Sequence, residues 1–262
     1  MNSGVAQTGM GFCGRILAVW NRHMRVYGRN LVSNGLPPFL EPLIFLGGIG
    51  LGFRGYVGMI EGMPYLRFLG TGLLVTTAMF TAAYECTYVT FIRLEFEKVY
   101  DGMLAAPLTV RDLFLGEILW AGSKGLFFSF AVLLVLSLCG IVSFWAALAA
   151  PLIGFVTAVM FGAVGLLVTS FVKTINHFSF FFTGLMSPMF FFCGVVFSIA
   201  KLPGWIRPVV ELLPLTHPVR LMRAIVQGQY GVILLWDGVY IVLLTLLAGT
   251  WAIRRLRRRL IT

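Results

Sequence analysis

Six long apolar runs restrict what this chain can fold into more than any other feature of its sequence. They lie at about residues 34–53, 66–90, 113–138, 144–170, 177–199 and 232–253. Each run is close to the ~20 apolar residues that a helix needs to cross a bilayer. Only 11% of the 262 residues are charged, against about 25% in soluble domains. The pattern predicts an all-α, polytopic membrane protein with six transmembrane helices in one transmembrane domain, residues 1–262.

Lysine and arginine are distributed unevenly between the segments that connect these runs. If the N-terminus lies inside, thirteen basic residues fall in inner segments and six in outer ones. The positive-inside rule therefore places both termini in the cytoplasm. The net charge of +10 gathers next to apolar runs, which fits anionic lipid headgroups and argues against nucleic-acid binding.

Residues 11–31 have the pattern of a basic amphipathic helix. One helical face is apolar and the other is basic, because the two sets are Phe12, Ile16, Val19, Trp20, Met24, Tyr27, Leu31 and Arg15, Arg22, Arg25, Arg29. Such a helix is expected to lie along the cytoplasmic headgroups as an interfacial helix. The alternative is an ordinary helix packed on protein.

The segment before the last run, residues 200–231, is too apolar for a solvated loop and too rich in proline for a span. It predicts a re-entrant outer segment of two short helices, one around residues 205–213 and one over about 218–227. Its candidate functional residues are Trp205, His217, Arg220 and Arg223.

Five of the ten acidic residues lie between Arg93 and Glu117, with Glu85 just before them. Long apolar runs flank this charged stretch on both sides. An apolar protein that gathers its charge in one hinge is expected to offer that hinge to a water-soluble partner. Residues 93–112 are therefore interpreted as a cytoplasmic coupling segment.

Ionisable residues within the predicted spans are costly and mark functional positions. Glu85 and Lys124 are equally far from the apex of their hairpin at Leu104–Ala105. They are expected at similar depth, where they form an ion pair or share a polar network, or else extend separately to the inner interface. Glu41, at the start of the first span, is a third polar candidate for the transport pathway.

Sequence motifs for catalysis are absent. The chain has no GxxxxGK[ST] loop, so it is not expected to hydrolyse nucleotides, and no HExxH, GxSxG or clustered Cys/His spacing that would predict an enzyme or a metal site. The four cysteines are scattered, as small buried apolar residues would be. No catalytic residue, metal or cofactor is therefore expected in this chain.

The order of these features resembles the ABC-2 class of ABC-transporter permeases, and most closely its NodJ-like branch. The likeness covers nearly the whole chain and is carried by Gly62–Tyr65, Phe68–Gly72, Ala82–Tyr88 with Glu85, Met103–Pro107, Leu113–Gly116, Glu117, Lys124, Thr169, Ser187–Phe197, Leu213–His217 and Arg220.

The resemblance implies a homodimer in the bacterial inner membrane, paired with two cytosolic NodI-like subunits that bind ATP and Mg. The implied activity is export of a lipo-oligosaccharide, a glycolipid or a related amphiphilic glycan, along a pathway lined by the first, second and fifth spans. In the family, the segment after the second span docks in a groove on the ATPase. The residues that would do so here are Glu95, Phe96, Glu97, Lys98, Tyr100, Asp101, Met103 and Arg111.

Other readings remain open on sequence grounds. An ABC-2 exporter of a drug or another small hydrophobic compound has the same overall pattern. An ion-coupled secondary transporter could use Glu85 and Lys124, although no internal repeat supports it. A membrane-embedded transferase is disfavoured, because histidine and aspartate are not clustered.

Overall fold

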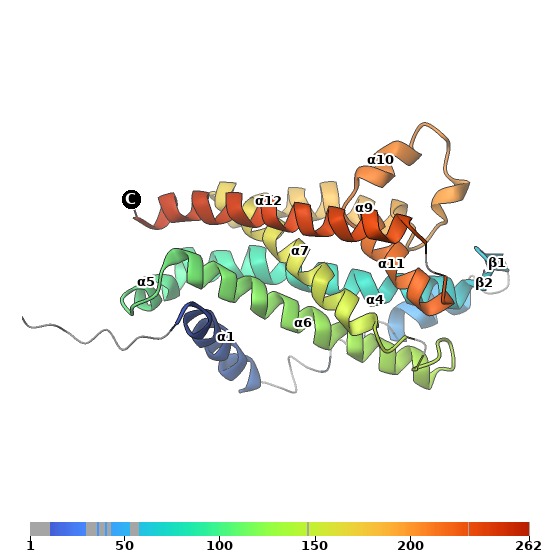
Figure 1. Ribbon diagram of the computed structural model, residues 1–262, viewed down its shortest axis with the longest axis horizontal. Helices are drawn as coiled ribbons and strands as arrows, with labels where there is room; N and C mark the ends of the chain where they lie inside the picture. The colour runs from blue at the N-terminus through green and yellow to red at the C-terminus, as the bar shows by residue number, and fades with distance from the viewer. Residues whose placement is uncertain are drawn as a thin grey trace, which may run out of the picture.

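The computed structural model describes residues 11–29, 36, 40, 43–52, 58–145, 147–229 and 231–261 (Figure 1). Within these ranges, four helices are long and apolar enough to cross a bilayer: Tyr65–Phe96, Val110–Leu138, Ala150–Phe171 and Ile233–Leu260. The first comprises α4 (Tyr65–Tyr84) and the π-helical turns η2 (Glu85–Val89) and η3 (Ile92–Phe96). The others are α6 (Val110–Leu138), α7 (Ala150–Phe171) and α12 (Ile233–Ile261). Four of the six predicted spans are therefore confirmed as helices.

The other two predicted spans have different outcomes. The span at 34–53 falls largely outside the described residues, and its described part includes η1 (Leu46–Leu51). The span at 177–199 is shorter than predicted. After η4 (Ile175–His177) it runs through α8 (Phe178–Phe181), η5 (Phe182–Met186) and α9 (Ser187–Phe192), then ends before Gly194, whose φ is +85°. A helix of that length rises about 22 Å, less than the ~30 Å of a bilayer core.

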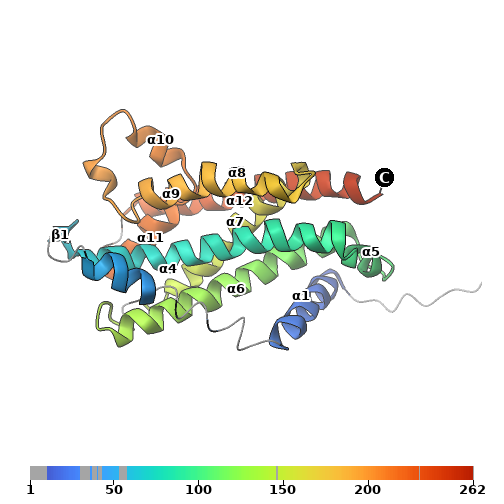
Figure 2. The same cartoon turned by 180° about the vertical axis from the view of Figure 1, so that it is seen from behind.

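The long helices run side by side along the molecule (Figures 1 and 2). The approach of α6 to α7 is so close that it requires glycine. A Cβ atom on Gly154 would lie 2.1 Å from Ser129 Oγ, and one on Gly125 would lie 2.2 Å from Ala158 Cβ. Small residues at such contacts let helix backbones pack closely in a membrane.

Short elements gather at the two ends of the bundle. At the end that holds the C-terminus lies α5 (Val99–Leu104), and a capping box of Thr109 and Asp112 then begins α6 (Figure 1). At the other end lie the hairpin β1 (Met59–Ile60) and β2 (Met63–Pro64), η6 (Ile199–Lys201), α10 (Arg207–Leu212) and α11 (Thr216–Gln227). The two helices expected within 200–231 are therefore present.

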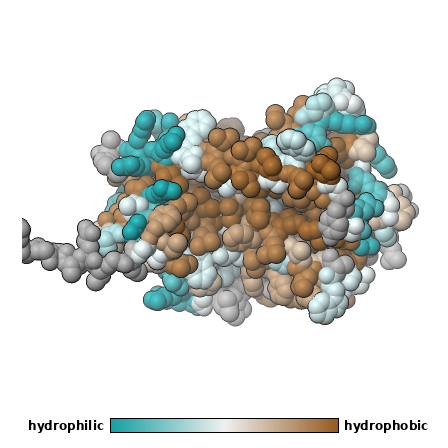
Figure 3. Space-filling model, in the orientation of Figure 1, coloured by the Kyte–Doolittle hydropathy of each residue, from teal (hydrophilic) through white to brown (hydrophobic). Residues whose placement is uncertain are grey.

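The molecular surface shows how the fold meets its solvent. In the view of Figure 3, apolar residues cover the middle of the molecule and hydrophilic residues lie at both ends. Helix α12 contributes much of this exposed apolar surface, since only 22% of its most apolar stretch is buried. Leu235, Leu243 and Leu247 are among its exposed side chains. Apolar surface on this scale is expected to face lipid.

The N-terminal helix α1 (Phe12–Gly28) packs against α6. Trp20 Nε1 donates to Ser123 Oγ at 2.9 Å, and Arg15 Nε donates to Asp112 Oδ2 at 2.8 Å. One arginine of the predicted basic face is thus bound to protein. The helix has a protein-facing side and an outward side, and Leu31, the last residue of the predicted apolar face, lies outside the described residues.

Candidate functional site

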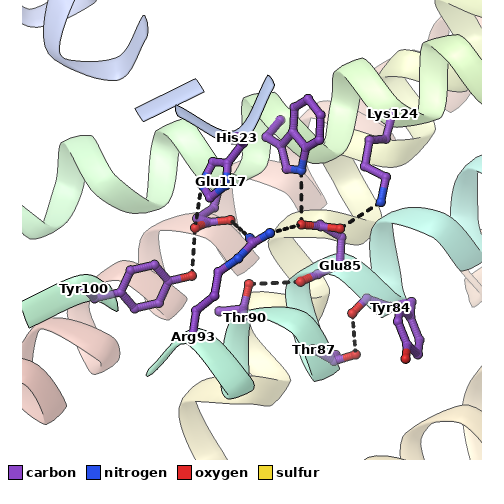
Figure 4. Close-up of polar contacts among 10 residues, drawn as sticks. His23, Tyr84, Glu85, Thr87, Thr90, Arg93, Tyr100, Glu117 and Lys124 are labelled. Atoms are coloured by element: carbon purple, nitrogen blue, oxygen red, sulfur yellow. Dashed lines mark hydrogen bonds and ion pairs between the residues drawn. The ribbon is translucent and has the colours of Figure 1, made fainter. Parts of the chain in front are cut away.

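The candidate site is a buried cluster of charged side chains that meets Tyr100 of α5 (Figure 4). At its centre, Lys124 Nζ lies 2.8 Å from Glu85 Oε2, so the ion pair expected from their equal distance to the hairpin apex is present. Trp120 Nε1 donates to Glu85 Oε1 at 3.1 Å. Glu85 is only 3% exposed. At that depth, its carboxylate needs these partners.

Arg93 extends the pair into a larger network. Its NH2 group lies 2.8 Å from Glu85 Oε1 and its NH1 group 3.0 Å from Glu117 Oε2. Glu117 is fully buried, and it also accepts a hydrogen bond from Tyr100 Oη at 2.7 Å. His23 Nε2 lies 2.9 Å from the same carboxylate. Two carboxylates and two cations therefore balance, as buried charges require.

The network joins four parts of the chain, because its members come from α1, the η2–η3 region, α5 and α6. One π-helical turn begins at Glu85 and a second begins at Ile92, and such turns are frequent at functional sites. The hydroxyl of Thr90 donates to the Glu85 carbonyl at 3.0 Å, which satisfies a backbone oxygen in this widened helix. Thr169 of α7 donates to the Cys86 carbonyl at 2.8 Å. A displacement of any one of these elements would therefore strain the charge pairs.

Tyr100 is the only member of the network on α5. Burial raises the pKa of its hydroxyl well above the usual value, and the charge of Glu117 raises it further. The hydroxyl therefore keeps its proton at neutral pH and remains a donor to Glu117. The charged groups of the cluster are held in ion pairs and hydrogen bonds, which suits the cluster to hold the helices in register.

The structure corrects two expectations about the charged hinge. Tyr100 is fully buried, so it does not offer an apolar anchor to a partner protein. Asp112 and Glu117 also face inward, at 1% and 0% exposure, because they bind Arg15 and Arg93. These two carboxylates, which the sequence placed in a hinge exposed to a partner, instead form ion pairs inside the helix bundle.

The remaining coupling candidates lie nearer the surface. Phe96 is 68% exposed, and Glu97, Lys98 and Asp101 are also exposed. These four residues define the α5 edge, the name used below.

Three other candidates lie beside this edge. Met103 is half-buried, and the guanidinium of Arg111 lies 5.4 Å from the centre of the Phe12 ring. Glu95 pairs with Arg259 of α12 at 2.8 Å. The charge of Glu95 is therefore already used within the chain.

The candidate residues within 200–231 separate into different groups. His217 Nδ1 lies 2.7 Å and Arg220 NH2 lies 2.5 Å from Asp237 Oδ1, and Arg220 also pairs with Glu211 at 2.9 Å. Arg223 instead donates to the Gly194 carbonyl and stacks 3.6 Å above the Phe68 ring.

Trp205 is 77% exposed. The structure thus ties α11 to α12 and to the chain after α9, but leaves Trp205 apart. Glu41 lies outside the described residues.

Sequence reasoning found Glu85 and Lys124 but missed Arg93, which binds Glu85, and Glu117, which binds Arg93. A signal existed, because Glu117 precedes Lys124 by seven residues, about two turns on one helical face. Nothing in the sequence indicated that α1 would bring His23 to the same carboxylate. Within the described residues, no three His, Cys, Asp or Glu side chains converge on a site for a metal ion.

A bundle of long apolar helices around a buried, charge-balanced network defines a polytopic membrane protein. Comparison with known proteins is specific about its class. The family model of the ABC-2 type transporter matches residues 14–226. The chain therefore belongs to the ABC-2 type transporter family, and it is a membrane permease.

Curated relatives agree with this assignment. Nodulation protein J of Sinorhizobium fredii is 32% identical over 215 residues, which is 82% of each chain. Nodulation protein J of Rhizobium meliloti is 31% identical over 81% of each chain. The inner membrane transport permease YadH of Escherichia coli is 25% identical over 76% of this chain and 78% of its own.

Proposed function

We propose that this permease is a homodimer that pairs with two cytosolic, NodI-like ATP-binding subunits and exports an amphiphilic glycan, such as a lipo-oligosaccharide or glycolipid. ATP and Mg would be bound by the partner subunits. The observation that carries the proposal is the similarity to nodulation protein J over four-fifths of the chain.

The topology proposed for this activity has six crossings of the bacterial inner membrane, with both termini and α5 in the cytoplasm. The fifth crossing combines the short helical run that ends at α9 with the chain that follows it. On the outer side, α10 and α11 form the re-entrant segment. The charge distribution supports this orientation, as does the position of α5 beside the C-terminus (Figure 1).

A cavity supports the proposed pathway along the first, second and fifth spans. It measures about 220 Å³ and is lined by Phe45, Leu73, Thr76, Thr77, Phe80, Ser187, Phe190 and Phe191. Aromatic rings dominate this lining, and a few hydroxyl groups interrupt it. Such a surface can contact both the acyl part and the sugar part of an amphiphile.

The α5 edge is the proposed contact with the ATPase. It offers one large apolar side chain, Phe96, among the exposed charges of Glu97, Lys98 and Asp101. A helix docked in a groove needs an apolar anchor with a polar rim. Reversal of two rim charges in Glu97→Lys/Asp101→Lys should reduce copurification of the ATPase and abolish transport. The matched control is Lys201→Glu, at the opposite end of the bundle, and normal recovery of the complex in the double variant would refute this docking role.

The experiment on substrate class uses proteoliposomes that contain the permease with its ATPase. Lipid extracts of a deletion strain and its complemented parent are compared by mass spectrometry, and the molecule that accumulates is then supplied to the vesicles. Transport of a glycan-bearing amphiphile that requires ATP hydrolysis is the expected result. Movement driven by an ion gradient without ATP, or of sugar-free hydrophobic compounds alone, would contradict the proposal.

A further inference from the structure

The outward face of α1 carries three arginines. Arg22, Arg25 and Arg29 line a surface cavity of about 480 Å³ together with Ala18, Asn21 and Val26. In the part of the chain that the structure describes, no carboxylate lies within 4.0 Å of these guanidinium groups. Like charges three and four residues apart on a helix repel each other. A bound anion would relieve that repulsion.

The contacts of α1 indicate its depth in the bilayer, given the proposed topology. About 20 residues of a helix cross the bilayer core, so counting back from Leu138 puts the inner boundary roughly beside Trp120. Trp20 binds Ser123 of α6, and His23 stacks on Trp120 with ring centroids 6.0 Å apart. The middle of α1 therefore lies at the level of the inner headgroups.

Apolar residues border the three arginines. Leu17 and Met24 are 47% and 40% exposed, and Val26, which lines the basic cavity, is 50% exposed. A second cavity of about 170 Å³ lies between α1 and α6, with Met24, Tyr27 and Phe127 among its lining residues. Exposure of these side chains to water would be unfavourable, whereas an acyl chain would cover them.

We propose that this face of α1 binds an anionic phospholipid of the inner leaflet. The headgroup phosphate lies among Arg22, Arg25 and Arg29, and the start of one acyl chain lies along Met24 and Phe127. The inference rests on the membrane orientation of the proposed function. An acidic surface of the ATPase is a less suitable occupant, because it would leave the neighbouring apolar side chains uncovered.

This lipid would act on the buried charges through α1. His23, on the protein-facing side of the same helix, contacts Glu117. A lipid that holds α1 against α6 therefore also holds one contact of the network. The anionic content of the inner leaflet would then influence how firmly the network is assembled.

The test measures lipid retained by the purified permease by native mass spectrometry. The probes are phosphatidylglycerol and phosphatidylcholine with identical acyl chains. The wild type should retain phosphatidylglycerol in preference. Arg22→Gln/Arg25→Gln should weaken that preference about 30-fold, since each basic residue at a membrane surface contributes a factor of about five. Arg254→Gln/Arg257→Gln removes two exposed charges at the same spacing from α12 and should leave most of the preference.

A second variant and a competitor complete the test. Arg22→Lys/Arg25→Lys keeps the charge and should retain most of the preference, which separates charge loss from misfolding. The proposal is overturned if the wild type shows no preference, if the α12 control loses as much, or if inorganic phosphate displaces the lipid. It is also overturned if the glutamine variant keeps its lipid but loses the ATPase. Because the lipid measurement itself needs neither ATPase nor transport, a failure of export with the lipid preference intact would contradict only the proposed function.

Discussion

Arg93 is the residue whose removal should most disturb the buried network, because among the described residues it alone bridges both carboxylates. In Arg93→Met, Glu85 keeps Lys124, but Glu117 keeps only Tyr100 and the imidazole of His23. The buried cluster then carries an unbalanced negative charge. Removing one partner of a buried pair typically costs 3–5 kcal/mol of stability. We expect a loss of about 4 kcal/mol in the free energy of unfolding.

A second substitution should recover part of that loss. Glu117→Gln removes the unbalanced charge, keeps nearly the same shape and still accepts a hydrogen bond from Tyr100. The double variant Arg93→Met/Glu117→Gln should therefore be about 2 kcal/mol more stable than Arg93→Met alone, a coupling within the range of contacting residues. The free energy of unfolding is measured by denaturation in mixed detergent micelles, with loss of helical circular dichroism as the signal.

The control uses a carboxylate outside the network. Asp101 is exposed on α5, so Asp101→Asn should combine additively with Arg93→Met, to within about 0.5 kcal/mol. The reasoning is refuted if Glu117→Gln gives no recovery. It is equally refuted if Asp101→Asn gives as much, since the effect would then reflect overall charge.

Three further predictions concern single sites. Tyr100→Phe should lower the free energy of unfolding by about 2 kcal/mol, because Glu117 loses a charged hydrogen bond, while copurification of the ATPase stays normal; reduced copurification without destabilisation would contradict the burial of Tyr100. Gly154→Val should prevent close packing of α6 on α7 through a clash with Ser129, seen as a lower melting temperature, and an unchanged value would refute that contact. Thr109→Ala should lower the free energy of unfolding by about 1 kcal/mol, because the N-cap of α6 is lost. If the variant unfolds at the same concentration of denaturing detergent as the wild type, the cap contributes nothing to stability.

The contact between Arg93 and Glu85 changes the result expected when the charges of Glu85 and Lys124 are exchanged. If Glu85 and Lys124 formed an isolated pair, exchanging them would restore the wild-type arrangement. Glu85 is also bound by Arg93 at 2.8 Å, so a lysine at that position would face a second cation. We expect the swap Glu85→Lys/Lys124→Glu to recover little of the loss caused by Glu85→Lys. A full recovery would show that Arg93 is not an essential partner.

The sequence by itself determined the membrane class, four of the long apolar helices, the two short helices within residues 200–231 and the similar depth of Glu85 and Lys124, whose pairing it left as one of two alternatives. These features depend on local composition or on spacing along one hairpin, and both can be read without tertiary information. The exposed residues Phe96, Glu97 and Asp101 were also identifiable as a charged edge, although its role in docking stays a prediction.

Only the tertiary structure decided which charges of the hinge face inward. Tyr100 and Glu117 have the same sequence character as their exposed neighbours. Glu117 is buried where α1 packs on α6 and where His23 and Arg93 reach its carboxylate, and Tyr100 is buried where α5 meets α6 and its hydroxyl binds Glu117. Contacts such as His23 with Glu117 join residues 94 positions apart, and no periodicity encodes them. The length of the helix that ends at Phe192 was likewise decided by packing, where Gly194 turns the chain and gives its carbonyl to Arg223.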